Sequence, residues 1–330
     1  MNWKKNAPWV IGFMLVMMLL LALTIQRSPP TSTPTKTTTR ILFIGNSLTF
    51  FNDMPEMVAE LARSGGHEVE VDMSAQGGWT LSDHAASETT LHKIEQQNWD
   101  YVILQEQSVI PSIENERNQR MYPAVRLLHD KVRESGATLI LFVTWGHRDG
   151  LPDAGFKDFD DMQVQLYSGY MDIANELDVM VAPVGIAWQN GIAENQQINL
   201  WHIDGVHPSK EGSYLCACVF YAIIFQQSPE GLTYKAGLSE EMAQFLQAIA
   251  AETADCAMVI IDTACLTREG KSLIRSSTSF LRLSYSAKSY TCPILSKISF
   301  VSLEIFSRVS SRTSTSSRAT FLVILMRIQR

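Results

Sequence analysis

The segment Arg40–Phe50, RILFIGNSLTF, decides the fold. Residues 41–44 form an apolar run without a polar break, and Gly45 ends it. A short apolar run that ends at glycine is typical of a strand buried on both faces of a parallel sheet. Residues 54–62 then show helical periodicity, with a proline near their start, where its missing N–H is tolerated. Ser47 is therefore predicted to lie where a buried strand meets a helix.

This position makes the hydroxyl of Ser47 a candidate functional group. In open α/β sheets, ligands bind beyond the carboxyl ends of the strands. The unpaired N–H groups at the start of a helix favour negative charge nearby. The alternative is that Ser47 only caps the helix or lines the turn, as serine commonly does.

Strands and helices are predicted to alternate along the chain from residue 41 onward. The predicted strands are 41–45, 68–73, 100–104, 138–144 and 179–184. The predicted helices are about 54–64, 87–97, 117–134, 161–177, 209–226 and 239–254. Such alternation predicts parallel βαβ units with right-handed crossovers, and so a three-layer α/β/α sandwich around a mostly parallel five-stranded sheet. Two long stretches, 145–160 and 186–206, follow strands and are expected to shape a substrate cleft.

The N-terminal part of the chain differs from this body. Residues 1–6 are expected to form a short cytoplasmic N-terminus, and 7–25 are an uncharged apolar run near the length that crosses a bilayer. We expect a retained transmembrane anchor rather than a cleaved signal peptide, because the run does not end in a small-residue cleavage site. The lysines that precede it then place the body outside the cytoplasm, whereas cleavage would release a secreted protein.

The regions that flank the body differ from it in composition. Residues 26–40 are rich in Pro and Thr and predict an extended linker. Residues 41–255 are predicted to form the folded domain. Residues 271–330 are rich in Ser, show no steady period and contain one acidic residue. We therefore expect 256–330 to be a Ser/Arg-rich disordered tail or the translation of a wrong reading frame. The alternative for this tail is a basic surface that binds anionic lipid.

Charge and cysteine content exclude some classes of function. Residues 41–270 hold 12 of the 27 basic residues and 33 of the 34 acidic residues, a formal charge of −21. Nucleic acid is therefore not an expected partner, since binding it requires Lys and Arg to neutralise phosphates. All five cysteines lie late in the chain, so no disulfide framework holds the body. Cys216 and Cys218 are interpreted as small buried residues, with a metal pair as the alternative.

A second motif, DGVHPS, occupies residues 204–209. Asp204 and His207 are three residues apart and can lie on the same side of a tight loop. Pro208 fixes its own φ, and Ser209 precedes a predicted helix. His207 is a candidate general base whose imidazole Asp204 would orient. The alternative is a surface loop with a capping serine and an incidental histidine.

Taken together, GNS after the first strand and DGVHPS before the last long helix resemble the SGNH (GDSL-type) hydrolase family. The resemblance covers residues 40 to about 226. It implies a flavodoxin-like α/β/α fold and ester hydrolysis by a Ser-His-Asp arrangement. Ser47 matches the family nucleophile, and Asp204 and His207 match its two triad partners. Asn46 stands where the family often has Asp.

The two middle blocks of the family match less closely. Gly78 aligns best with the glycine of the oxyanion hole because a threonine follows two residues later, and Gly77 is the second choice. After the third strand the family has Gly-x-Asn-Asp, whereas this chain has LQEQS at 104–108. The Asn position falls on Gln107, whose amide could donate to an oxyanion, with Gln105 as the alternative donor.

The resemblance implies a serine esterase with Ser47, Asp204 and His207 as catalytic residues. Ser47, Gly78 and Gln107 would form its oxyanion hole, and it requires neither a metal nor another cofactor. The expected partner is a small-molecule or carbohydrate ester, for instance an acylated surface polysaccharide, with the membrane contacted only through the N-terminal helix. Two alternatives remain: an inactive, membrane-anchored glycan-binding domain on the same fold, and a flavodoxin-like phosphate or FMN binder that uses the 45–52 loop.

Overall fold

A computed structural model describes residues 38–269, and within them five parallel strands form one sheet. The strands are β1 (Thr39–Gly45), β2 (Val69–Ala75), β3 (Tyr101–Leu104), β4 (Thr138–Phe142) and β5 (Met180–Ala182), in the order β2-β1-β3-β4-β5. Every neighbouring pair is parallel. All five predicted strands are present. The order reverses between β1 and β3, and this is the point at which such sheets bind ligands.

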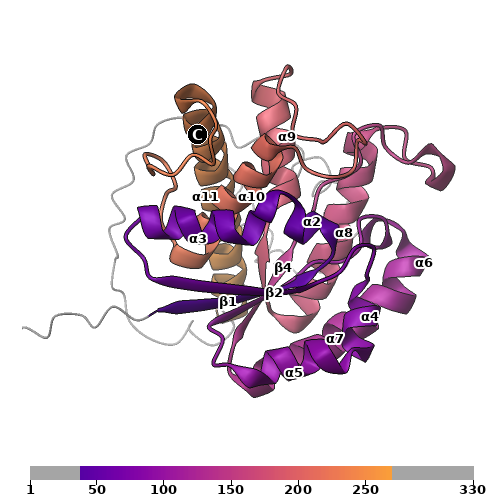
Figure 1. The fold of residues 1–330 in the computed structure, drawn as a ribbon. Helices are drawn as coiled ribbons and strands as arrows, with labels where there is room; N and C mark the ends of the chain where they lie inside the picture. Colours follow the sequence, from indigo (N-terminus) through magenta and orange to yellow (C-terminus); the bar gives the residue numbers. More distant parts are fainter. Residues whose placement is uncertain (1–37, 270–330) are drawn as a thin grey trace, which may run out of the picture.

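Helices cover both faces of the sheet and make the three predicted layers (Figure 1). The longer ones are α3 (Met54–Ser64), α5 (Glu88–Gln96), α7 (Tyr122–Ser135), α8 (Phe159–Leu177), α9 (Val184–Glu194), α10 (Lys210–Phe225) and α11 (Glu240–Glu269). The shorter ones are α2 (Ser47–Phe50), η1 (Phe51–Asp53), α4 (Leu81–Ala86), η2 (Ile110–Ser112), α6 (Glu114–Glu116), η3 (Arg117–Met121) and η4 (Pro152–Ala154).

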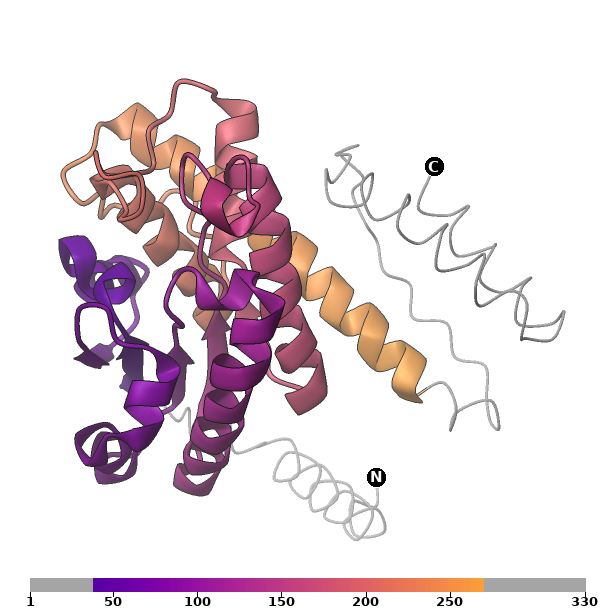
Figure 2. The ribbon, with the colours of Figure 1, turned by 90° about the vertical axis from the view of Figure 1, so that its right-hand side faces the viewer.

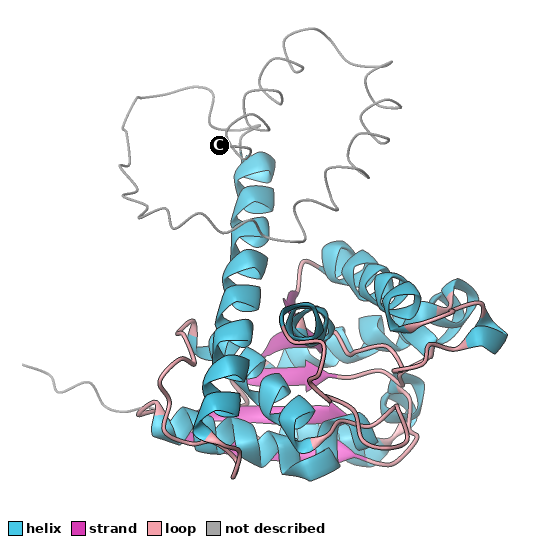
Figure 3. Cartoon of the chain, turned by 90° about the horizontal axis from the view of Figure 1, so that it is seen from above, coloured by secondary structure: helices cyan, strands magenta, loops and turns pink. Residues whose placement is uncertain are grey.

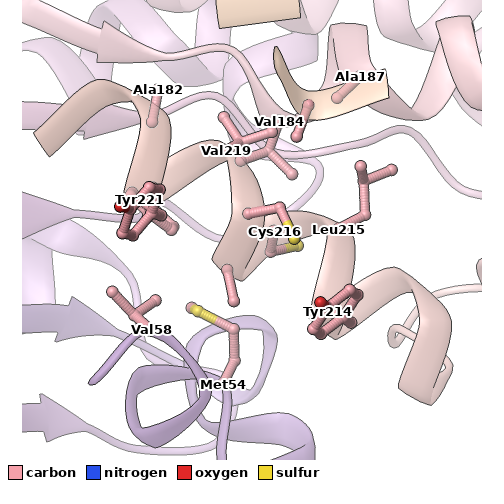
Figure 4. Close-up of a cluster of buried hydrophobic side chains, with 14 of the residues drawn as sticks. Met54, Val58, Ala182, Val184, Ala187, Tyr214, Leu215, Cys216, Val219 and Tyr221 are labelled. Carbon is pink, nitrogen blue, oxygen red and sulfur yellow. The ribbon is translucent and has the colours of Figure 1, made fainter. Parts of the chain in front are cut away.

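Strand β1 supplies both hydrophobic cores because successive side chains of a strand point to opposite faces. Ile41 and Phe43 pack with residues of α3, α10 and α11. Leu42 and Ile44 pack with residues of α4, α5, α7 and α8. Figure 4 shows part of the first core, in which the Cys216 side chain lies between apolar neighbours. Cys216 and Cys218 are both fully buried there, as predicted.

Helices α2, α4 and α9 lie where no helix is predicted, as do the short helical turns η1, η2, α6 and η4. The stretch 186–206 is therefore not a continuous loop, because α9 occupies its first part. Two glycines inside α9 weaken its helical signal, since glycine is a poor helix former. Close packing demands the first of them: a Cβ on Gly185 would lie 2.1 Å from the carbonyl oxygen of Thr144.

The boundaries of the folded part differ slightly from the predicted ones. Strand β1 begins at Thr39, inside the predicted linker, and α11 continues past residue 255 to Glu269. The last part of α11 extends away from the body (Figures 2 and 3). Within residues 38–269 no helix has the length and apolar character needed to cross a membrane. The predicted anchor at 7–25 and most of the predicted tail lie outside the described residues.

Candidate active site

Ser47 is the first residue of α2, directly after the carboxyl end of β1. Asn46 caps this helix, and its Oδ1 accepts a hydrogen bond from the N–H of Leu48 at 3.1 Å. The turn needs Gly45, because a Cβ there would lie 2.4 Å from Oε1 of Gln105. The backbone N–H of Ser47 has no acceptor inside the helix, since it belongs to the first turn. The sequence thus presents both a hydroxyl and a free N–H at this edge of the sheet.

The three predicted catalytic side chains form one hydrogen-bonded line. Oγ of Ser47 lies 2.8 Å from Nε2 of His207, and Nδ1 of His207 lies 2.7 Å from Oδ2 of Asp204. Because the carboxylate can only accept, Nδ1 carries the proton and Nε2 of the neutral ring is free to accept the hydroxyl hydrogen. The line therefore has the polarity that removing a proton from Ser47 requires.

The loop that carries Asp204 and His207 is fixed by residues that follow β4. The indole N–H of Trp145 donates to the carbonyl oxygen of Val206 at 2.9 Å. The backbone N–H of Arg148 donates to the carbonyl oxygen of Gly205 at 2.8 Å. The stretch 145–160 thus supports the site through its first residues.

The loop is also closed on itself and bound to the stretch after Ser47. The N–H of His202 donates to the carbonyl oxygen of His207 at 2.7 Å. The ring of Phe51 stacks on the imidazole of His207, with ring centroids 4.7 Å apart. The amide of Asn52 donates to the carbonyl oxygens of Pro208 and Ser209, each at 3.1 Å. These contacts limit how far the imidazole can move from the hydroxyl.

Asp204 is held as a carboxylate by four hydrogen bonds. Its partial burial acts to raise the pKa, but the N–H groups of Val206 and His207 donate to Oδ1, and the imidazoles of His207 and His202 contact Oδ2. Together these bonds hold the pKa of Asp204 well below its usual range. His202 is therefore a second imidazole in contact with this carboxylate.

Gly78 lies in the turn that follows β2. The N–H of Trp79 donates to the carbonyl oxygen of Gln76, and Gly78 has a φ of +75° in the third position of this turn. A residue at that position of a type II turn needs a positive φ, which glycine adopts without strain. The turn is bound to the Ser47 segment, because Nδ2 of Asn46 donates to the carbonyl oxygen of Trp79 at 2.8 Å.

The two candidate glutamines after β3 have different environments. Gln105 is fully buried, and its Oε1 accepts from the N–H of Asn46 at 2.8 Å and from the hydroxyl of Thr49 at 2.9 Å. The side chain of Gln105 thus stabilises the turn that carries Ser47. Gln107 is partly exposed; Oε1 accepts from the N–H of Val109, and Nε2 is 3.4 Å from Oγ of Ser108. Nε2 keeps a second hydrogen that is free for a substrate.

Glu106, between the two glutamines, is buried. No part of its side chain is exposed to solvent. Burial raises the pKa of its carboxyl group to about 7, against the lowering effect of hydrogen bonds from the N–H groups of Gln107 and Leu81. No sequence signal indicated this, because a carboxyl group between two glutamines reads as polar surface.

Three tryptophans and one further histidine lie close to the stretches that follow β4 and β5. Trp145, Trp188 and Trp201 are buried and pack together, with the rings of Trp145 and Trp188 stacked 4.2 Å apart. Nε2 of His147 lies 3.0 Å from Oγ of Ser108, and burial lowers the pKa of this imidazole. Among residues 38–269, no group of three or more His, Cys, Asp or Glu side chains is arranged to hold a metal ion.

Comparison with known families assigns the chain. The family model described as "Domain of unknown function (DUF4886)" matches residues 77–254, more than half of the sequence. The chain belongs to the DUF4886 family. The matched range contains Asp204 and His207 of the candidate site, whereas Ser47 precedes it.

Several solved structures are similar to this DUF4886 protein. A protein from Slackia heliotrinireducens described as "a putative SGNH hydrolase" is 31% identical, with a TM-score of 0.49 over 57% of this chain and 100% of its own. A DUF4886 family protein from Bacteroides uniformis is 20% identical, with a TM-score of 0.55 over 66% of this chain and 95% of its own. A lipase/acylhydrolase from Enterococcus faecalis is 16% identical, with a TM-score of 0.44 over 58% and 98%. The comparison with curated proteins found no match.

The protein from Slackia heliotrinireducens, which is 31% identical and covered in full by this chain, confirms the predicted resemblance to SGNH hydrolases. The Bacteroides uniformis structure and the five-stranded parallel sheet confirm the three-layer α/β/α fold. The sheet order is that of flavodoxin-like folds, with the candidate site at the reversal point of the order.

Proposed function

We propose that the protein is a serine-dependent ester hydrolase with Ser47 as nucleophile, His207 as general base and Asp204 as the residue that orients His207. The observation that carries the proposal is the unbroken line of hydrogen bonds from Asp204 through His207 to Ser47, with distances of 2.7 and 2.8 Å. Two segments that are 160 residues apart in the sequence supply its members. A capping serine needs no such partner.

In the first half of the reaction, Oγ of Ser47 attacks the carbonyl carbon of the ester while Nε2 of His207 takes its proton. Asp204, held as a carboxylate, stabilises the resulting imidazolium. The bond from the carbonyl carbon to the alcohol oxygen then breaks, and His207 returns the proton to the leaving alcohol. An acyl group remains on Ser47.

In the second half, water attacks the acyl carbon and gives its proton to His207. The bond to Oγ of Ser47 breaks, and the proton passes from His207 back to the serine. The products are one carboxylic acid and one alcohol, and the enzyme regains its starting state. The chemistry described needs only these side chains and water.

The negative oxygen that forms in both halves needs hydrogen-bond donors placed in advance. The proposed donors are the backbone N–H groups of Ser47 and Gly78 and Nε2 of Gln107. Two observations support this set: Ser47 begins a helix, and the amide oxygen of Gln107 is already engaged by Val109. Removal of one such donor typically costs on the order of 10²–10³ in kcat.

The proposed substrates are acyl esters of carbohydrates outside the cytoplasm. The support is the sequence: an apolar run at 7–25 that follows two lysines, and a body of strongly negative charge. The negative body disfavours polyanionic substrates, because like charges repel at short range.

The direct test is hydrolysis of p-nitrophenyl acetate by the full-length chain and by Ser47→Ala. We expect wild-type turnover and a loss of at least about 10³-fold in kcat for the variant, because the nucleophile is absent. Ser135→Ala is the matched control. The hydroxyl of Ser135 donates to the carbonyl oxygen of Val132, and the residue precedes the amino-terminal end of β4, opposite the end where Ser47 lies. Equal activity of wild type and Ser47→Ala would refute the proposal.

A further inference from the structure

Glu106 carries a buried carboxyl group that the proposed reaction does not use. It lies two residues after the end of β3, between Gln105 and the proposed oxyanion donor Gln107. Its Oε1 accepts two hydrogen bonds, from the N–H of Leu81 at 3.1 Å and from the N–H of Gln107 at 2.7 Å. In the described part of the chain, Oε2 is buried without a hydrogen-bond partner. An oxygen left in this state costs free energy, so the residue calls for an explanation.

The two N–H groups belong to the two segments that would supply oxyanion donors besides Ser47. Leu81 begins α4 and follows Thr80, whose side chain forms a capping box with Asp83. The turn that contains Gly78 ends immediately before this cap. A rigid connection from Oε1 of Glu106 to Leu81 therefore fixes the Gly78 turn relative to β3.

The same turn is fixed on its other side by Asn46. Nδ2 of Asn46 donates to the carbonyl oxygen of Trp79, and the N–H of Asn46 donates to Oε1 of Gln105. Asn46 thus joins the Gly78 turn to Ser47, and Glu106 joins it to Gln107. These bonds connect the three segments that would supply the oxyanion donors to one another.

We propose that Glu106 is a positioning residue of the oxyanion hole, which sets the distance between the Gly78 turn and Gln107 through the two hydrogen bonds to Oε1. The inference rests on the proposed function, and it goes beyond it by giving a buried residue outside the catalytic line a role in the reaction. A displacement of about 1 Å in such a site can cost on the order of 10²-fold in rate.

The length of the side chain and its acceptor oxygen, rather than its charge, are the properties that this role needs. Glutamine has the same length and keeps an acceptor oxygen for both N–H groups. Aspartate keeps the charge but is shorter by one methylene group, so it cannot reach both N–H groups at once. The titratable groups around the carboxyl are Arg120, Asp83 and the hydroxyl of Tyr170, which accepts from the N–H of Glu106.

The test compares Glu106→Gln, Glu106→Asp and Glu106→Ala in the full-length chain by kcat and KM for p-nitrophenyl acetate. We expect Glu106→Gln to retain kcat within about threefold, because the bridge persists. Glu106→Asp and Glu106→Ala should lose about 10- to 100-fold in kcat with KM changed less than about threefold, since the donors act on the transition state. If Glu106→Ala does not fold, the comparison of kcat between Glu106→Gln and Glu106→Asp tests the proposal.

Gln247→Ala is the matched control for a structural effect. Gln247 is equally buried and also joins separate segments, through hydrogen bonds to Gly231 and to the hydroxyl of Tyr214. We expect it to lower Tm without lowering kcat. The inference would be overturned if Glu106→Asp and Glu106→Ala lowered Tm but left kcat unchanged. It would also be overturned if Glu106→Gln lowered kcat and Glu106→Asp did not. A wild type without Ser47-dependent turnover would instead overturn the proposed function.

Discussion

The imidazole of His207 makes three contacts, and each of them constrains its chemistry. Asp204 fixes the proton on Nδ1, Ser47 faces Nε2, and the ring of Phe51 covers one face at a centroid distance of 4.7 Å. A ring held in this way has one tautomer and one orientation for transfer of the serine proton. The three-residue spacing predicted the contact between Asp204 and His207, and the resemblance to SGNH hydrolases implied the contact with Ser47. The sequence could not predict the third, because Phe51 reads equally well as part of a core.

Glu106 gives a pH-dependent prediction at the same scale. Burial raises its pKa in the folded protein to about 7, whereas the ordinary value is 4.5. The folded state therefore keeps a proton that the unfolded chain releases, and the free energy of unfolding falls as pH rises from 4.5 to 7. Glu106→Gln removes this loss, so its stability relative to wild type should rise by about 2–3 kcal/mol between pH 5 and pH 8.

Urea unfolding of both proteins at the two pH values measures this difference. A difference in unfolding free energy that is the same at pH 5 and at pH 8 would show that Glu106 does not titrate as its burial requires. The raised pKa of Glu106 could not be predicted from the sequence, because the burial of this residue depends on where α4 and α8 pack.

At the scale of elements, the side chain of Asn52 connects η1 to α10. Asn52 has a φ of 56° and donates to the carbonyl oxygens of Pro208 and Ser209 and to the hydroxyl of Ser213. Asparagine tolerates this left-handed conformation better than most residues other than glycine. The residue therefore fixes the start of α10, and with it the loop that precedes it, against the turn that follows Ser47.

Two replacements of Asn52 separate the contribution of its hydrogen bonds from that of its left-handed backbone conformation. Asn52→Gly keeps the backbone conformation and loses the hydrogen bonds, whereas Asn52→Ala also strains the backbone. We expect both to lower the free energy of unfolding, by about 1–3 kcal/mol, with Ala the more destabilising. Urea denaturation measures the stabilities of the two variants and the wild type. Equal stability of Asn52→Ala and wild type would contradict the proposed role of Asn52 in holding α10 against η1.

The elements differ in how far the sequence predicts them. The strands were predictable because parallel strands buried on both faces leave uninterrupted apolar runs, as in 41–44. Helix α9 was not, because its burial between α8 and α11 outweighs the weak helical propensity of two glycines. Helix α4 has only six residues, too few to show a period. The length of such short or glycine-containing helices is set by tertiary packing.

At the scale of the whole molecule, the site forms because the sheet brings distant segments to one edge. Residues from β1–α2, the turn after β2, the end of β3 and the loop before α10 converge there. The sequence alone provided the motifs and their order. Their meeting required the strand order β2-β1-β3-β4-β5, which local patterns do not encode and which the resemblance to SGNH hydrolases implied. The proposal of Gln107 rather than Gln105 as an oxyanion donor likewise rests on burial, because the fold buries Gln105 and leaves Gln107 partly exposed.

The most direct test of the account is covalent labelling of the intact, full-length chain with a fluorophosphonate, followed by mass measurement and peptide mapping. The hydroxyl of Ser47, activated by His207, is predicted to form a single adduct, absent from Ser47→Ala and retained in Ser135→Ala. A wild type that takes up no label, as an inactive glycan-binding domain would, or that carries the label on another residue would contradict the claim that Ser47 is the nucleophile.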